Sequence, residues 1–144
     1  MSKRHGELFL LDILVAAAKI AETRAMHESP DSLKHHYHHW DSVIREFEII
    51  AEATKHLIRM GWLDENEKRV VDFRNLVSHY YFGIDAEAVV EVIDEHMPPF
   101  EERVKSRFLE CPKEVREEAL ETTIEENEHI DFVKRRLETL KESP

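Results

Sequence analysis

The chain contains only three glycines and five prolines among its 144 residues. Glycine and proline are the residues that interrupt helices most strongly, so their scarcity leaves long segments free to be helical. Charged residues make up 35% of the sequence, and the good helix formers Glu, Lys, Leu and Ala are abundant. A chain of this length typically buries one core. We therefore expect a protein of the all-α class.

Apolar residues recur at helical spacing in five successive segments. We expect helices over about residues 7–24, 32–61, 64–83, 85–111 and 113–140. Pro98 and Pro99 interrupt the fourth segment, because proline removes a backbone donor and crowds the preceding turn. The first four segments predict an up-and-down four-helix bundle domain over residues 1–110. The fifth predicts one additional long, acidic C-terminal helix, which forms an extension over residues 111–144.

The formal net charge of -11 argues against binding of nucleic acid over the whole surface, because phosphate contacts need Lys and Arg. Any contact with RNA must therefore be local. The single cysteine, Cys111, cannot form an internal disulfide. The apolar run near the N-terminus is interrupted by Glu7 and Asp12, which favours neither a signal peptide nor a membrane span. These features predict a cytoplasmic protein without a membrane partner.

Arg74, His79 and Tyr81 form the pattern Arg-x4-His-x-Tyr. On a regular helix, which turns by about 100° per residue, Tyr81 lies almost directly above Arg74, whereas His79 is displaced by roughly 140°. One regular helix therefore cannot direct all three side chains at one point. Either the helix is distorted near Gly83, or a second copy of the chain completes the site across a two-fold interface.

These residue types suit cleavage of RNA without a metal ion. An imidazole such as that of His79 can take the proton of a ribose 2′-hydroxyl, and the Arg74 guanidinium can stabilise the charge that develops on phosphorus. Two copies of His79 in a dimer could divide the roles of base and acid. By spacing alone, however, an arginine and a histidine on one helix serve more often in capping, ion pairing or packing than in catalysis.

A resemblance to a known family favours the catalytic interpretation. Residues 74–85 read RNLVSHYYFGID and resemble the signature of the HepT-like ribonucleases, a branch of the HEPN superfamily. Residues 43–53, which read VIREFEIIAEA, are similar to the run in the second helix of that family. The likeness continues from Asp85 to Pro98, so that about residues 7–109 are covered in the same order.

The resemblance implies a four-helix HEPN core and a homodimer in which the motifs of both chains line a shared cleft. It implies a ribonuclease toxin without a cofactor, restrained by a minimal nucleotidyltransferase antitoxin. By position, Arg74 and His79 are the catalytic pair, Asn75 is a polar support, and Tyr81 is the residue to which the antitoxin attaches AMP.

Further residues could bind the RNA substrate around this motif. The basic candidates lie near the end of the second expected helix and at the start of the third: Lys55, Arg59, Lys68 and Arg69. Three aromatic residues could stack on bases: Trp62, Tyr80 and Tyr81. Trp62 can equally well pack against the bundle, since it directly follows the helix end.

Two other clusters suggest metal binding or docking. His35 and His39, in a run of four histidines around Tyr37, are spaced so that they could share an ion, but no Cys or carboxylate beside them completes the shell. Exposed histidines at a helix start explain the run as well, and we assign no metal site. A di-iron centre would need Glu-x-x-His twice, and the pattern occurs once, at Glu126 and His129. The acidic block over residues 117–128 is either a solvated face, or a surface that docks the partner or shields the RNA cleft.

The sequence is also consistent with two rival functions. The same bundle could be a non-catalytic module that holds a nucleotide or a substrate for a nucleotidyltransferase. It could also be a purely structural dimerisation unit. The combination of Arg74, His79 and Tyr81 favours the ribonuclease, because a scaffold has no evident need for these three residues.

Overall fold

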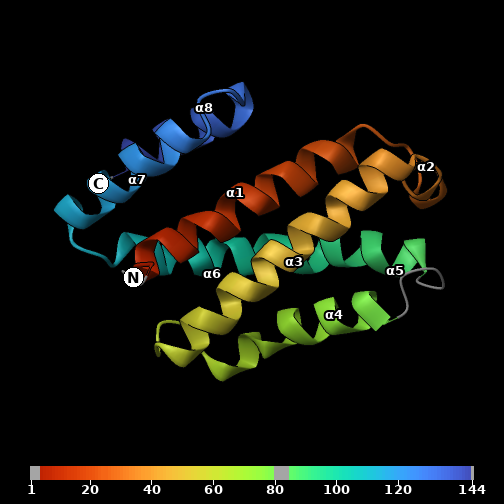
Figure 1. Ribbon diagram of the computed structural model, residues 1–144, viewed down its shortest axis with the longest axis horizontal. Helices are drawn as coiled ribbons and strands as arrows, with labels where there is room; N and C mark the ends of the chain where they lie inside the picture. The colour runs from red at the N-terminus through yellow and green to blue at the C-terminus, as the bar shows by residue number, and fades with distance from the viewer. Residues whose placement is uncertain (1–3, 80–84, 144) are drawn as a thin grey trace.

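Figure 1 shows the chain as a computed structural model, which describes residues 4–79 and 85–143 except for the side chains of residues 75–79. The described residues form helices and turns and contain no strand, so the predicted all-α class is confirmed. The helices are α1 (Gly6–Ala25), α2 (Pro30–His35), α3 (Tyr37–Arg59), α4 (Lys68–His79), α5 (Ala86–Glu91), α6 (Met97–Leu109), α7 (Lys113–Glu126) and α8 (Asp131–Lys141). A 3-10 turn (Glu65–Glu67) precedes α4, and a π-helical turn (Val92–His96) joins α5 to α6.

The ends of the helices have local causes in the sequence. Gly61 has a φ of 75°, and the N–H groups of Gly61 and Trp62 donate to the carbonyls of Ile58 and Leu57, which closes the end of α3. Asp85 caps α5 by accepting from the N–H of Glu87 at 2.9 Å. The expected helix ends at Gly61 and Asp85 are therefore confirmed.

The fourth expected helix, over residues 85–111, is interrupted near Pro98 and Pro99, as predicted. Pro98 lies in the first turn of α6, directly after the π-helical turn, so its missing backbone N–H falls where the helical hydrogen-bond pattern changes. The sequence did not reveal that the preceding residues, Val92–His96, form a π-helical turn. This turn connects α5 to α6 along one continuous path.

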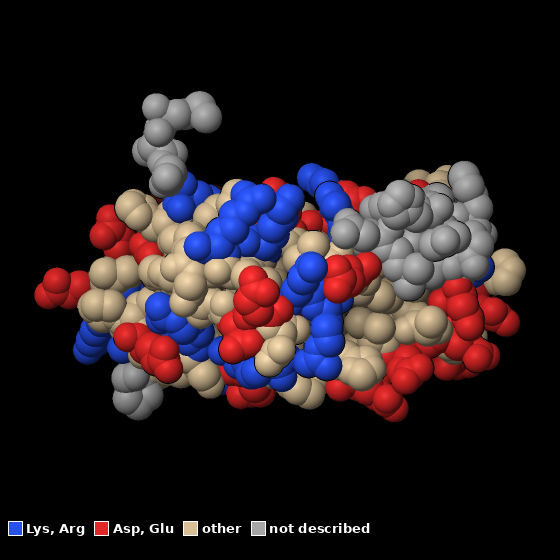
Figure 2. Space-filling view, turned by 90° about the horizontal axis from the view of Figure 1, so that it is seen from below, with Lys and Arg blue, Asp and Glu red and all other residues tan. Residues whose placement is uncertain are grey.

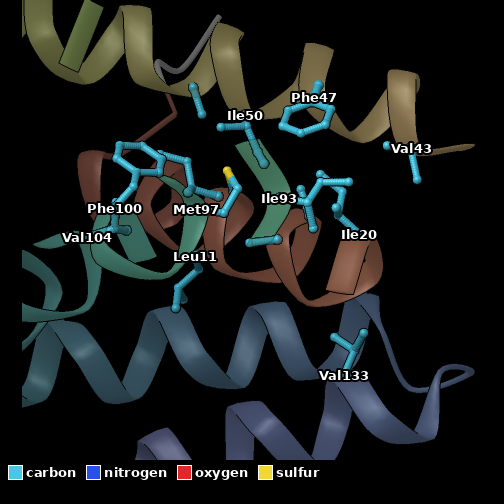
Figure 3. Packing of buried hydrophobic residues seen from close by; sticks show 14 of the residues in the cluster. Leu11, Ile20, Val43, Phe47, Ile50, Ile93, Met97, Phe100, Val104 and Val133 are labelled. Atoms are coloured by element: carbon cyan, nitrogen blue, oxygen red, sulfur yellow. The ribbon is translucent and has the colours of Figure 1, made fainter. Parts of the chain in front are cut away.

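α1 is the central helix of the fold. It packs against α3 and α6 and also contacts α7 and α8 (Figure 1). Figure 3 shows the core around it, with labelled side chains from α1, α3, α6 and α8: Leu11, Ile20, Val43, Phe47, Ile50, Met97, Phe100, Val104 and Val133. Burial of such side chains is the main favourable term in the folding of a domain of this size.

The expected single C-terminal helix is wrong. Residues 113–141 form two helices, α7 and α8, that fold back on each other beside α1 (Figure 1). Asn127 ends α7: its side-chain amide donates to the carbonyl of Thr123 at 2.9 Å, and its own carbonyl accepts from the N–H of Ile130. The reversal places Leu120 and Leu137 in the same hydrophobic cluster as α1 and α3. One long helix could not bury both segments against α1.

None of the described helices is both long and apolar enough to cross a bilayer.

Candidate active site

α4 carries the described part of the Arg-x4-His-x-Tyr pattern and packs along α3 (Figure 1). The turn that starts it is fixed by Asp64, whose carboxylate accepts from the N–H of Asn66 at 2.8 Å. On the core side, the ring of Phe73 meets the ring of Phe47 edge to face at 5.0 Å. These contacts set the position of α4 against the bundle.

A buried ion pair ties the start of α4 to α6. The carboxylate of Glu67 is 7% exposed and accepts two hydrogen bonds from Arg103, at 2.7 and 2.9 Å. The hydrogen bond to Glu67 is the main reason why the pKa of Arg103 is raised. Because a buried carboxylate without this partner is costly, the pair holds α4 near α6.

Arg74 extends from α4 into a groove of about 360 Å³ that it shares with α1 and α3. The other residues of this groove, called the Arg74 groove below, are Phe9, Asp12, Arg45, Glu48, Ile49, Glu52 and Ala53. Arg74 is half-buried, and Arg45 is paired with Glu48 at 3.4 Å. The groove therefore combines two guanidinium groups with three carboxylates. A guanidinium in such a groove can donate to phosphate oxygens, whereas the neighbouring carboxylates repel them.

The remaining residues of the predicted site are only partly placed. Asn75 and His79 lie on α4, but their side chains are outside the described part of the structure. Tyr80 and Tyr81 lie outside the described residues altogether. Their roles stay predictions, and only Arg74 has a described environment.

The predicted RNA-binding residues are exposed but do not line the Arg74 groove. Lys55 and Arg59 lie on the last turns of α3, and Lys68 and Arg69 lie on the first turn of α4. Figure 2 views the α4 side of the molecule and shows Lys and Arg side chains gathered over its middle, with Asp and Glu dominant toward one end. On this face the positive charge is therefore gathered locally, in keeping with the negative net charge.

Sequence reasoning missed Arg45 as a neighbour of Arg74. Arg45, Ile49 and Glu52 follow one another at helical spacing on α3, and this spacing puts them on the same face. This helical spacing is visible in the sequence, but only the packing of α4 on α3 shows that this face of α3 meets Arg74.

Trp62 packs against the fold, so the packing interpretation is confirmed. The guanidinium of Arg107 lies over its ring at 4.4 Å from the centroid. On the other side the ring approaches Gly6 so closely that an added Cβ would meet it at 2.7 Å. A glycine at position 6 therefore lets α1 pass beside the loop that leads to α4.

The histidine run lies at the corner between α2 and α3, and the structure adds His27 to it. The Nε2 atom of His27 lies 2.6 Å from Nδ1 of His39, and the ring of His36 stacks on that of His39 at 3.6 Å. His35 instead bonds the carbonyl of Asp31 through its Nδ1 atom. The two residues that could have shared an ion, His35 and His39, are thus engaged with different partners.

We expect the protein to lose stability in mild acid, in part through His39. Desolvation, followed by the charges of His36, His27 and His38, lowers the pKa of His39. Between this lowered value and the unfolded value of about 6.5, the unfolded chain binds more protons, so the free energy of unfolding falls as the pH falls. Urea unfolding at pH 7.5 and pH 5 should show this loss, and His39→Gln should reduce it.

The control for this prediction is His129→Gln, which changes an exposed histidine in the turn between α7 and α8. This variant should keep the pH dependence of the wild type. If His39→Gln lost as much stability between the two pH values as the wild type, the histidine corner would not be the source of the acid sensitivity.

Taken together, the fold and the groove define a helical-bundle protein with a polar site between three helices. The family described as "Ribonuclease HepT-like" matches residues 13–107, a range that includes Arg74 and the whole of α4. The chain therefore belongs to the HepT-like ribonuclease family.

The chain is 31% identical over 108 residues to a protein of Methanocaldococcus jannaschii named "Putative RNase MJ1380", and the match covers 73% of this chain and 98% of that protein. No solved structure matches the chain.

Proposed function

We propose that the protein is a metal-independent ribonuclease that acts as the HEPN toxin of a toxin–antitoxin pair. The observation that carries this proposal is the family match over residues 13–107, which contains the Arg-x4-His-x-Tyr pattern. The position of Arg74 in a groove between α1, α3 and α4 supports it, because a half-buried guanidinium beside an open groove is suited to a phosphate.

In the proposed reaction, His79 takes part in proton transfer at the ribose 2′-hydroxyl, and Arg74 stabilises the negative charge on the phosphate oxygens. Asn75 supports this pair. Lys55, Arg59, Lys68 and Arg69 contact the RNA backbone around the site. Residues 1–110 form the up-and-down four-helix bundle that supplies the site, as one half of a homodimer, and residues 111–144 form its extension.

Incubation of the purified protein with single-stranded RNA in the presence of a chelator tests the reaction class. We expect cleavage to proceed, because the proposed groups need no metal ion. Loss of cleavage in chelator would replace this mechanism with a metal-dependent one. Binding of nucleotides without any cleavage would favour a non-catalytic partner of a nucleotidyltransferase.

The proposed regulation is attachment of AMP to Tyr81 by a minimal nucleotidyltransferase antitoxin. Tyr81 follows Arg74 by seven residues, which on a regular helix corresponds to two turns, and a phosphate attached there would compete with RNA for the guanidinium and repel the RNA backbone. After co-expression with the antitoxin, mass spectrometry should find AMP on the peptide that contains Tyr81, and Tyr81→Phe should stay active. If the added mass lay elsewhere, or if the Phe variant were silenced equally, steric occlusion would have to explain the inhibition.

A further inference from the structure

A second pocket, of about 200 Å³, lies between α1, α3 and the end of α7. It shares Asp12 and Ile49 with the Arg74 groove, so the two hollows adjoin each other. Three carboxylates line this pocket, those of Asp12, Glu46 and Glu126, against a single lysine. The pocket, called the Glu46 pocket below, is therefore suited to a cation.

Glu46 is the buried member of this group. The residue is 9% exposed, and within the described part of the chain its carboxylate accepts no hydrogen bond and forms no ion pair. Burial raises the pKa of Glu46, and the charges of Lys19 and Arg45 oppose that rise without cancelling it. A buried carboxylate without a donor costs free energy, and native structures rarely leave such a group without a partner. The pocket that Glu46 lines has room for a partner that the chain does not supply.

The other acceptors of the pocket stand on different helices. Asp12 on α1 already has a partner, because Arg4 donates to its two carboxylate oxygens at 2.9 and 2.7 Å. Glu126 is exposed and is the last residue of α7. Asn127 donates through its side-chain nitrogen to a backbone carbonyl of α7, which leaves its side-chain oxygen as an acceptor. Open acceptors therefore lie on two walls of the pocket, on α3 and at the end of α7.

The spacing of these acceptors favours an extended ligand over a metal ion. In the described structure the carboxylate oxygens of Asp12, Glu46 and Glu126 do not all lie within 4.8 Å of one another, so one ion cannot take all three as ligands. A linear diamine carries three N–H donors on the ammonium group at each end and an apolar chain between them. The apolar part of the lining, which includes Val15 and Ala16, suits that chain.

We propose that the Glu46 pocket binds a linear diamine or polyamine, with one ammonium group donating to Glu46 and the other to Glu126 and Asn127. This inference does not depend on the proposed ribonuclease function. The ligand supplies the positive charge that the buried carboxylate lacks. Lys19, which lines the same pocket, is the cation that competes with it.

Calorimetric titration of the full chain with hexamethylenediamine, at constant ionic strength, tests the proposal. We expect saturable binding to one site, and Glu46→Gln should weaken it by about tenfold or more, because the buried acceptor loses its charge. Hexamethonium has the same charges and the same chain but no N–H donors, and it should bind at least about tenfold more weakly. Lys19→Met should strengthen binding of the diamine, because it removes the competing charge.

Glu118→Gln is the matched control, because it removes an exposed carboxylate of α7 that does not line the pocket, and it should bind like the wild type. Without ligand, Glu46→Gln should unfold at a temperature no lower than the wild type, since it removes an unpaired buried charge. A loss of stability would mean that Lys19 already satisfies Glu46 and would overturn the proposal. Unchanged binding by Glu46→Gln, or equal binding of hexamethonium, would also overturn it. If acetyl-lysine amide bound as tightly as the diamine, the two-ended site would be wrong and a lysine side chain of a partner protein would take its place.

Discussion

Arg74→Ala should reduce RNA cleavage by about 10²-fold to 10³-fold and leave the helical signal unchanged. The expected magnitude is that of removing a donor which stabilises the charge of a transition state. Arg74 is half-buried at the groove and does not belong to the hydrophobic core, so its truncation should cost little packing. The matched variant Arg74→Lys keeps the charge but loses the planar fork, and it should recover only part of the activity. Full activity in Arg74→Ala would remove Arg74 from the mechanism.

In the same assay, we expect His79→Ala to abolish cleavage. If each site combines Arg74 of one chain with His79 of its partner, mixed dimers of the two inactive variants regain one intact site. About a quarter of the wild-type activity should then return on mixing. No recovery on mixing, while light scattering shows that dimers exchange, would mean that each chain supplies its own Arg74 and His79.

Arg103→Met should lower the free energy of unfolding by about 2 kcal/mol, because it leaves the buried carboxylate of Glu67 without its partner. Breaking a fully buried pair typically costs about 3–5 kcal/mol. We expect less here because the Arg103 side chain is 49% exposed, so water can reach Glu67 after the change. Urea unfolding followed by circular dichroism measures the difference.

The control for this prediction is the double variant Glu67→Gln with Arg103→Met, which removes the charge together with its partner. It should recover part of the lost stability, because no unpaired charge remains buried. Equal destabilisation in the single and double variants would mean that Arg103 acts through its packing on Phe100 and not through the ion pair.

Much of the local structure could be predicted because its causes are local. Gly61 ends α3 by adopting a φ that other residues disfavour, and Pro98 interrupts the helix before α6 by lacking a backbone donor. The apolar stripe of α3 predicted its buried face, which includes Phe47 and Ile50. The C-terminal region was predicted wrongly, because a narrow apolar stripe is compatible with one long helix or with two that fold back at Asn127.

Part of the candidate site could also be predicted, because its causes lie within a short stretch of sequence. The order and spacing of Arg74, His79 and Tyr81 are properties of the sequence, as is the likeness to the HepT-like family. The neighbours of Arg74 were not predictable, because Phe9 and Arg45 are far from it along the chain and reach the groove through the packing of α1, α3 and α4.

The sequence by itself determined the all-α class, the ends of several helices, the local placement of positive charge and the family. These depend on backbone preferences and on the period of apolar residues, which act over a few positions. Only the tertiary structure decided that α7 and α8 fold back on α1, that Glu67 pairs with Arg103, that His27 contacts His39, and that Phe9 and Arg45 share a groove with Arg74. Each of these contacts joins residues from different structural elements. Which elements lie side by side depends on how their apolar faces pack away from water, and no local sequence pattern specifies that packing.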